Sequence, residues 1–192
     1  MKRVLLGGEV PLTDPMIGSG GKLSPSWEGW FNRLDQTIRN IPGPTIHLAK
    51  TSLVDDLGGA AGTKVQIRWD DELRKDDAFT HSNSTNPGRI TVATDARYRV
   101  TASVSATQGG GARTTLMLYV RVDGTTEVAR CVARNYSRGS TYGDLSNNIV
   151  TELDLTRGQY IEIQSEVDDT DASYTINTIA AQCECIIQRI ER

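Results

Sequence analysis

The amino-acid sequence predicts an all-β protein: an antiparallel jelly-roll sandwich preceded by an N-terminal extended arm and one amphipathic helix. Three observations lead to this fold class. The chain is rich in residues that pack well on a pleated sheet, with 21 Thr, 13 Val and 14 Ile against 14 Leu. Apolar and polar residues alternate with a period of two in most segments after residue 64. No helical segment separates these stretches, which favours an antiparallel sandwich.

Length and charge narrow the class of protein further. A chain of 192 residues fits one compact domain plus an extra segment better than two domains. Its 21 basic and 24 acidic residues give a net charge of −3, so nothing marks it as a nucleic-acid-binding protein. No window approaches the roughly 18 apolar residues of a membrane span, and Met1–Val10 is too short for a secretory signal. We therefore expect no nucleic acid and no membrane insertion.

The N-terminal part is predicted to be an arm followed by a helix. Residues 1–23 contain several Gly and two Pro without sustained periodicity, which predicts an extended arm. Ser24-Pro25-Ser26 is typical of a helix start, because Ser caps unpaired N–H groups and Pro is favoured in the first turn. Pro and Gly at 42–44 end the helix. The helix is predicted over about residues 25–40, with an apolar stripe formed by Trp27, Trp30, Phe31, Leu34 and Ile38.

This stripe has two interpretations. A helix of about four turns is marginal alone in water, so its apolar side must pack on something. It packs either on its own domain or on a partner, which includes a second copy of the chain. We favour the partner, because the helix lies between a loose arm and a Pro-Gly-Pro break. The domain division that follows is an N-terminal anchoring arm and helix over 1–49, a linker rich in Gly and Ala over 50–63, and a β-sheet head over 64–192.

The head is predicted to contain about eight strands. The clearest runs from Tyr98 to Ala106, where apolar residues alternate with Arg, Thr and Ser. Polar or Gly-rich segments bound every predicted strand, so the connections are expected to be turns and loops. The other predicted strands are 65–69, 89–92, 116–122, 128–132, 149–155, 161–167 and 179–190.

Residues that carry catalysis or bind metals are scarce. His47 and His81 are the only histidines, both on expected loops, and no Gly-x-Ser-x-Gly sequence occurs, so we expect no enzyme and no cofactor. Cys183 and Cys185 share one face of a predicted strand and are expected in the core. A zinc site is not expected there, because no second ligand pair has workable spacing. Asp168–Asp171 is predicted to be a solvated turn, and Ca²⁺ binding there is left open.

Several segments of the head follow one another in an order that resembles a known family. A Phe and a turn precede a strand with an aromatic residue and alternating small apolar residues, and two later segments are similar to a hairpin and a strand-turn-strand of that family. These segments are Phe79, Asn86–Gly88, Ala96–Val104, Leu118–Gly124 and Leu153–Ile161. The pattern resembles the ten-stranded jelly roll shared by the complement globular head and tumour necrosis factor, particularly its versions in bacteriophage structural proteins.

The segments Pro11–Pro15 and Lys22–Leu34 are in turn similar to the openings of small phage virion proteins. Together the two resemblances imply a trimeric head attached to a virion-anchoring segment. The implied function is a structural component of a phage particle, namely a head or tail fibre, spike or decoration protein. The implied partners are two further copies of the chain, a capsid, portal or tail protein, and a host surface receptor or glycan. The implied location is the virion, assembled in the host cytoplasm.

A second function remains open from the sequence. The head is alternatively a receptor- or glycan-binding adhesin module for host attachment. A glycan-cleaving enzyme is disfavoured, because no closely placed pair of acidic residues stands in a strand context.

Overall fold

The computed structural model describes residues 17, 22–25, 27–32, 43–57, 62–109, 113–124, 126–138, 142–167 and 175–190. The chain divides into two units, Met1–Pro42 and Gly43–Arg192. The second unit consists of antiparallel β-sheets, which confirms the predicted all-β class.

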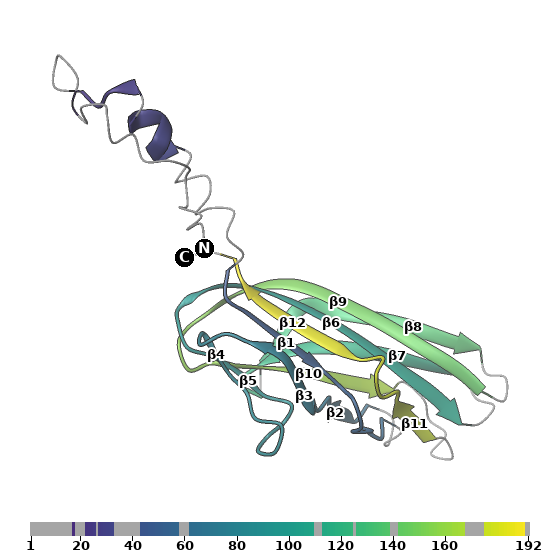
Figure 1. Ribbon diagram of the computed structural model, residues 1–192. Helices are drawn as coiled ribbons and strands as arrows, with labels where there is room; N and C mark the ends of the chain where they lie inside the picture. The colour runs from purple at the N-terminus through teal and green to yellow at the C-terminus, as the bar shows by residue number, and fades with distance from the viewer. Residues whose placement is uncertain are drawn as a thin grey trace. The chain divides into compact units, whose positions relative to one another are not determined.

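Two sheets make up the second unit (Figure 1), and within the described residues each contains six strands. The first sheet has the order β11-β6-β12-β1-β3, and β9 pairs with the other edge of β6. Its strands are β1 (Thr45–Ala49), β3 (Asp71–Lys75), β6 (Ala96–Gly109), β9 (Tyr142–Leu155), β11 (Thr175–Thr178) and β12 (Glu184–Arg189). The second has the order β4-β5-β10-β7-β8, with β2 beside β10. Its strands are β2 (Lys64–Gln66), β4 (Phe79–Thr80), β5 (Ile90–Val92), β7 (Arg113–Val122), β8 (Thr126–Arg138) and β10 (Tyr160–Val167).

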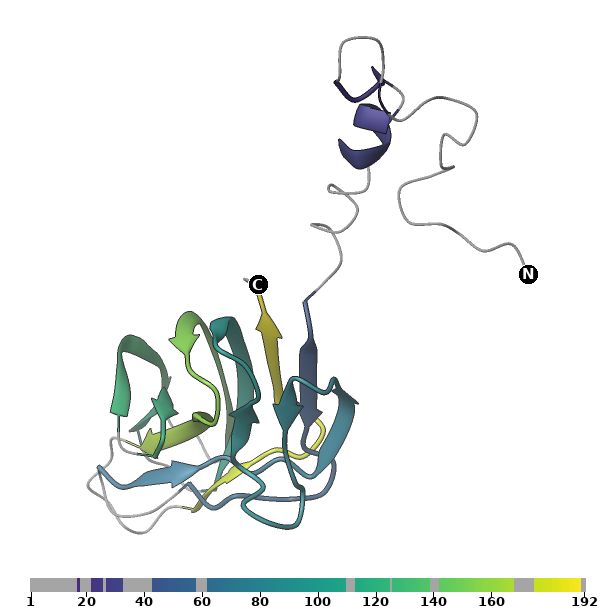
Figure 2. The same ribbon diagram turned by 90° about the vertical axis from the view of Figure 1, so that its left-hand side faces the viewer.

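Four antiparallel pairs are nested around one hairpin. The pair β7–β8 is innermost in the sequence, and it is enclosed in turn by β6–β9, β5–β10 and β1–β12. The innermost and third pairs lie in the second sheet, and the other two lie in the first. The outermost pair joins the two ends of the unit, because Thr45 lies opposite Gln188, and Figure 2 shows β1 and β12 side by side.

The core lies between the two sheets and is lined by every second residue of most strands. The ring of Tyr98 meets that of Phe79 edge-on at 5.8 Å, and its hydroxyl donates to the carbonyl of Thr94 at 2.8 Å. Burying a large apolar side chain stabilises a fold by about 1.5–3 kcal/mol, so this layer carries most of the stability. Its largest apolar members include Trp69, Tyr98, Ile46, Leu48, Leu116 and Ile161.

The structure divides the chain at a different place from the sequence prediction. Residues 45–49 were assigned to the arm, but they form β1, which pairs with both β12 and β3. Residues 50–57 were assigned to the linker, but Lys50, Asp55 and Leu57 are buried and the amide of Leu57 donates to the carbonyl of Ile176 at 2.6 Å. A five-residue alternation next to Pro and Gly is too short to distinguish a strand from an extended arm.

Two further predictions are corrected at the level of single elements. The strand predicted over 179–190 is a turn followed by β12, because the chain reverses after β11 where Ala181 has a φ of 62°. His47 was expected on a loop but lies in the middle of β1. The predicted strands at 98–106 and 149–155 are both parts of longer strands, β6 and β9.

Candidate functional site

The predicted docking helix belongs to the N-terminal unit. Pro25 and residues 27–32 are helical. Three of the five predicted stripe residues form an aromatic cluster with ring-centroid distances of 5.1–6.0 Å, namely Trp27, Trp30 and Phe31. Leu34 and Ile38 lie outside the described residues, as does the predicted end of the helix near residue 40.

This aromatic cluster is accompanied by exposed apolar side chains. Phe31 is partly exposed, and so are Ile17 and Leu23, which face each other across an isolated antiparallel bridge. The indole N–H of Trp30 is buried and has no hydrogen-bond acceptor among the described residues. Exposed apolar surface of this kind is typical of a contact with another protein.

A second surface lies on the outer side of the first sheet. We define the β6–β9 face as the outward residues of β1, β12, β6 and β9 near their middle: His47, Ala49, Thr101, Ser103, Asn148, Val150, Glu184 and Ile186. One row crosses the sheet from Val150 through Thr101 and Ile186 to His47. Val150 is 65% exposed although its neighbours in the row are half-buried. Most of these side chains are short, so the face has low relief.

Ion pairs border the β6–β9 face. Arg97 lies 2.9 Å from Asp154, and Arg99 lies 2.8 Å from Glu152. The hydrogen bond from Arg97 holds the pKa of Asp154 below its ordinary value. Both Arg residues lie on the outer side of the sheet, opposite the buried residues of β6. The charges pair within one chain, which leaves the face close to neutral.

The outer side of the second sheet is built differently, because long polar side chains cover it. Glu162 on β10 is only 4% exposed although it points outward. Its carboxylate accepts hydrogen bonds from Gln66 at 2.8 Å, Arg89 at 3.0 Å and Gln164 at 3.1 Å. Arg89 also stacks over the ring of Tyr160 at 4.5 Å. This polar layer covers the sheet with the chain's own side chains.

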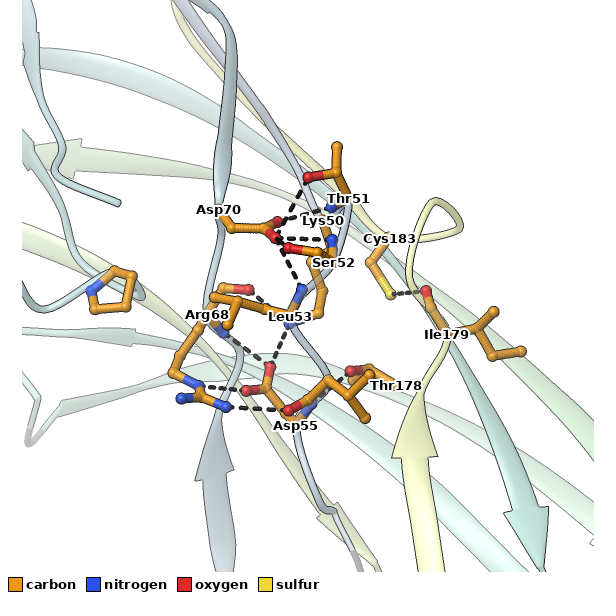
Figure 3. Close-up of polar contacts among 12 residues, drawn as sticks. Lys50, Thr51, Ser52, Leu53, Asp55, Arg68, Asp70, Thr178, Ile179 and Cys183 are labelled. Atoms are coloured by element: carbon orange, nitrogen blue, oxygen red, sulfur yellow. Dashed lines mark hydrogen bonds and ion pairs between the residues drawn. The ribbon is translucent and has the colours of Figure 1, made fainter. Parts of the chain in front are cut away.

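A buried charged cluster joins three segments (Figure 3). The Lys50 ammonium is fully buried and donates to Asp55 at 2.7 Å and to the carbonyl of Arg68 at 2.7 Å. The Asp55 carboxylate also accepts the amide and the Nε–H of Arg68. The backbone of Asp55 exchanges two hydrogen bonds with Thr178, so the cluster fixes residues 50–57 to the end of β11.

Above this cluster, Asp70 holds the turn that follows β1 (Figure 3). Its carboxylate accepts the amides of Thr51, Ser52 and Leu53 at 2.7–2.8 Å, as well as the hydroxyl of Ser52 at 2.7 Å. Burial alone would raise the pKa of Asp70, but these hydrogen bonds outweigh it and hold the pKa well below its ordinary value. Neither group was predicted from the sequence, since all their contacts except Lys50–Asp55 join residues 13 to 123 positions apart. They hold the fold together rather than face a ligand.

Cys183, which directly precedes β12, and Cys185, which lies within it, are core residues, as predicted. Cys183 and Cys185 are free thiols with at most 1% exposure. Burial raises the pKa of both, that of Cys185 to about 12, so neither is a reactive thiolate at neutral pH. The Cys131 side chain and the Asp168–Asp171 turn lie outside the described residues.

In the part of the chain that the structure describes, no group of three or more metal-binding side chains is found. The helices in that part include none that is long and apolar enough to cross a membrane. The chain matches no protein-family model, and no curated protein matches it.

Proposed function

We propose that the chain is a structural component of a phage particle, with a head that forms a homotrimer and an N-terminal segment that holds it on another particle protein. The head is a jelly roll in this proposal. The nested strand pairs and their alternation between two sheets support it, because a jelly roll is a long antiparallel hairpin folded over into two sheets.

The contrast between the two outer faces carries the proposal of self-association. Long polar side chains cover the second sheet, whereas the β6–β9 face presents mostly short side chains, with the exposed Val150 on its β9 side. A flat, nearly neutral face with an exposed apolar side chain on one side can be buried against another flat protein surface. In a closed ring of three identical chains the contacts are heterologous, so this face is proposed to lie at the threefold axis, where one part of it meets a different part of the next copy.

The aromatic cluster supports the proposal of docking through the N-terminal segment. Trp27, Trp30 and Phe31 place three large rings in one short helix. Their unit is separate from the sandwich. Trp and other aromatic residues dominate the energetics of protein interfaces, so this cluster suits a contact with a larger particle.

Native mass spectrometry of the full chain tests the trimer. We expect a trimer for the unaltered protein and a monomer for Val150→Arg, because a buried unpaired charge opposes association. Val54→Arg is the matched control, since Val54 is also exposed, at 49%, but lies away from the β6–β9 face. A monomeric unaltered protein, or a trimeric Val150→Arg, contradicts the assignment.

Incorporation into particles tests the anchor. The double variant Trp27→Ala and Trp30→Ala is expected to fold its head and form trimers, yet to be missing from purified particles. Circular dichroism checks the head, and quantitative mass spectrometry of particles measures incorporation. Retention of the variant in particles at the level of the unaltered protein would show that the helix has no docking role.

A receptor- or glycan-binding module is the second candidate function, and the outer side of the second sheet favours it. Arg89 is held by Glu162 and Tyr160 while its side chain is 44% exposed. Polar side chains of this kind bind sugar hydroxyls and carboxylates. A glycan array with the full chain and with Arg89→Ala separates the two functions. Binding that the variant loses favours recognition, and no binding favours a purely structural head.

A further inference from the structure

His81 is a buried group that the proposed function does not use. It follows β4 and opens the loop of residues 81–89, which leads to β5. Its imidazole side chain is fully buried, while residues 83–86 of the same loop are exposed. His81 therefore lies at the base of an exposed hairpin loop, and its contacts decide how that loop is held.

Both ring nitrogens of His81 face oxygen atoms. Nδ1 lies 2.9 Å from a carboxylate oxygen of Glu72 on β3, and Nε2 lies 3.0 Å from the carbonyl oxygen of Pro87. The first contact joins the loop to the other sheet, and the second closes the loop on itself. The carbonyl of Pro87 also accepts the amide of Trp69 at 2.9 Å, so it is held in place from a third segment.

The number of donors in this arrangement determines the charge of the ring. A carbonyl oxygen only accepts hydrogen bonds, and so does an ionised carboxylate. A neutral imidazole has one N–H, so one of the two oxygens would face a nitrogen lone pair at about 3 Å. The imidazolium has two N–H groups and satisfies both contacts. The geometry is complete only when the ring carries its second proton.

The carboxylate beside the ring favours the same state. Glu72 and Lys75 of β3 are the charged side chains in contact with the His81 residue, with Lys75 2.7 Å from Glu72 and 3.3 Å from the His81 carbonyl. Burial alone would raise the pKa of Glu72, but hydrogen bonds from Lys75 and His81 outweigh it and lower the pKa. The Glu72 carboxylate is therefore ionised, and it accepts a hydrogen bond from Nδ1 of His81 rather than donating one.

We infer that His81 is a proton-dependent lock on the β4–β5 loop. The imidazolium ties the loop to Glu72 on the other sheet and to Pro87 within the loop. Loss of the ring proton at higher pH removes one of these bonds and releases the loop. The bonded form holds one proton more than the released form, so a higher pH favours opening, by at most about tenfold per pH unit.

The ring nitrogens report the lock directly in the unaltered full chain. Long-range ¹H–¹⁵N NMR at about pH 6, close to the range where histidines titrate, is expected to show both nitrogens of His81 protonated. The only other histidine, His47, is the internal reference. A single protonated nitrogen on His81 under these conditions would overturn the inference.

Hydrogen exchange of the loop amides then tests the release. Protection factors of Thr85 and Arg89, whose amides are bonded within the loop, are expected to fall by about tenfold or more between about pH 6 and pH 9. In His81→Gln, which has no titrating ring, protection is expected to be low and independent of pH. His47→Gln is expected to behave like the unaltered protein. Loop protection that does not change with pH in the unaltered protein would contradict the lock, even with a doubly protonated ring.

Discussion

Lys50 and its partners show how single residues fix the path of this chain. The ammonium is fully buried, and its charge is balanced by Asp55, which Arg68 also holds. Removing one partner from a buried ion pair is far more damaging than removing both, because a charge remains without compensation. Removal of Asp55 leaves the Lys50 ammonium without a counter-charge, whereas removal of Lys50 leaves Asp55 paired with Arg68.

We expect Asp55→Ala to destabilise the protein by about 3–5 kcal/mol, because it leaves the Lys50 ammonium buried without a counter-charge. Lys50→Met is expected to lower stability by only about 1–2 kcal/mol, since Asp55 keeps the amide and the Nε–H of Arg68. Chemical denaturation of the two variants measures the difference. The exposed Asp77→Ala is the control, with a small expected effect. Equal losses for Asp55→Ala and Lys50→Met would contradict this account of the cluster.

Asp70 leads to a prediction about acid stability. Its pKa is held below the ordinary value of 3.8, so the folded state prefers the ionised form. This contribution is present above the ordinary pKa and is lost as the pH falls towards the lower value of the folded state. Asp70→Asn is therefore expected to cost about 1–2 kcal/mol at neutral pH and less in acid. Thermal melts of both proteins across pH measure the difference in stability between them. A difference that stays constant into acid counts against the prediction.

Some of these residue environments follow from the sequence and others do not. The burial of Cys183 and Cys185 was predictable, because residues two positions apart on a strand point to the same face of the sheet. The burial of Lys50, Glu162 and His81 was not. Each is also held by a residue from another segment, namely Arg68, Gln66 and Glu72 respectively, whereas a polar residue in a local pattern indicates solvent.

At the scale of the element, β1 is a strand that the local sequence pattern did not predict. It has five residues and an alternating burial pattern, and its neighbours on both sides come from distant parts of the chain. Its beginning is tightly packed, because a Cβ on Gly43 would run into the carbonyl oxygen of Arg189. The amide of Arg189 donates to the carbonyl of Pro44 at 2.9 Å. The residues that lead into β1 therefore lie directly against the end of β12.

Gly43→Ala is expected to destabilise the protein by about 2 kcal/mol, because the added carbon meets backbone that cannot rotate away. Gly158→Ala is the matched comparison. Gly158 has a φ of +90° with nothing within 4 Å of an added carbon, so its cost comes from backbone strain alone, about 1 kcal/mol. The denaturation midpoints of both variants test whether Gly43→Ala is the more destabilising of the two. A Gly43→Ala variant as stable as the unaltered protein would show that the β1–β12 end tolerates displacement.

At the scale of the whole molecule, the sandwich closes only when its two ends meet. Thr45 and Gln188 face each other although almost the entire unit lies between them in sequence. The other nested pairs also join strands from different parts of the chain. Such long-range pairing makes the sandwich cooperative, because most strands, unlike β8 of the β7–β8 hairpin, belong to a sheet that only distant segments complete.

Two truncations test where the head begins. Removal of residues 1–42 is expected to leave the sandwich folded, since the division lies between Pro42 and Gly43. Removal of residues 1–49 takes away β1 and leaves β12 and β3 without their shared neighbour, so we expect loss of cooperative unfolding and aggregation through the open strand edges. Circular dichroism melts and light scattering distinguish the two. A stable protein after the longer truncation would restore the division at residue 49.

The all-β class, the inward faces of the strands around residues 98–106 and 149–155, and the core position of the two cysteines were determined by the sequence alone. Each of these depends on alternation within one strand, which is a local property of an extended chain. The tertiary structure decided that β1 belongs to the head, which strands share a sheet, and why Lys50, Glu162 and His81 are buried. Those outcomes depend on partners that are distant in sequence, and a local pattern carries no information about which distant segment will cover it.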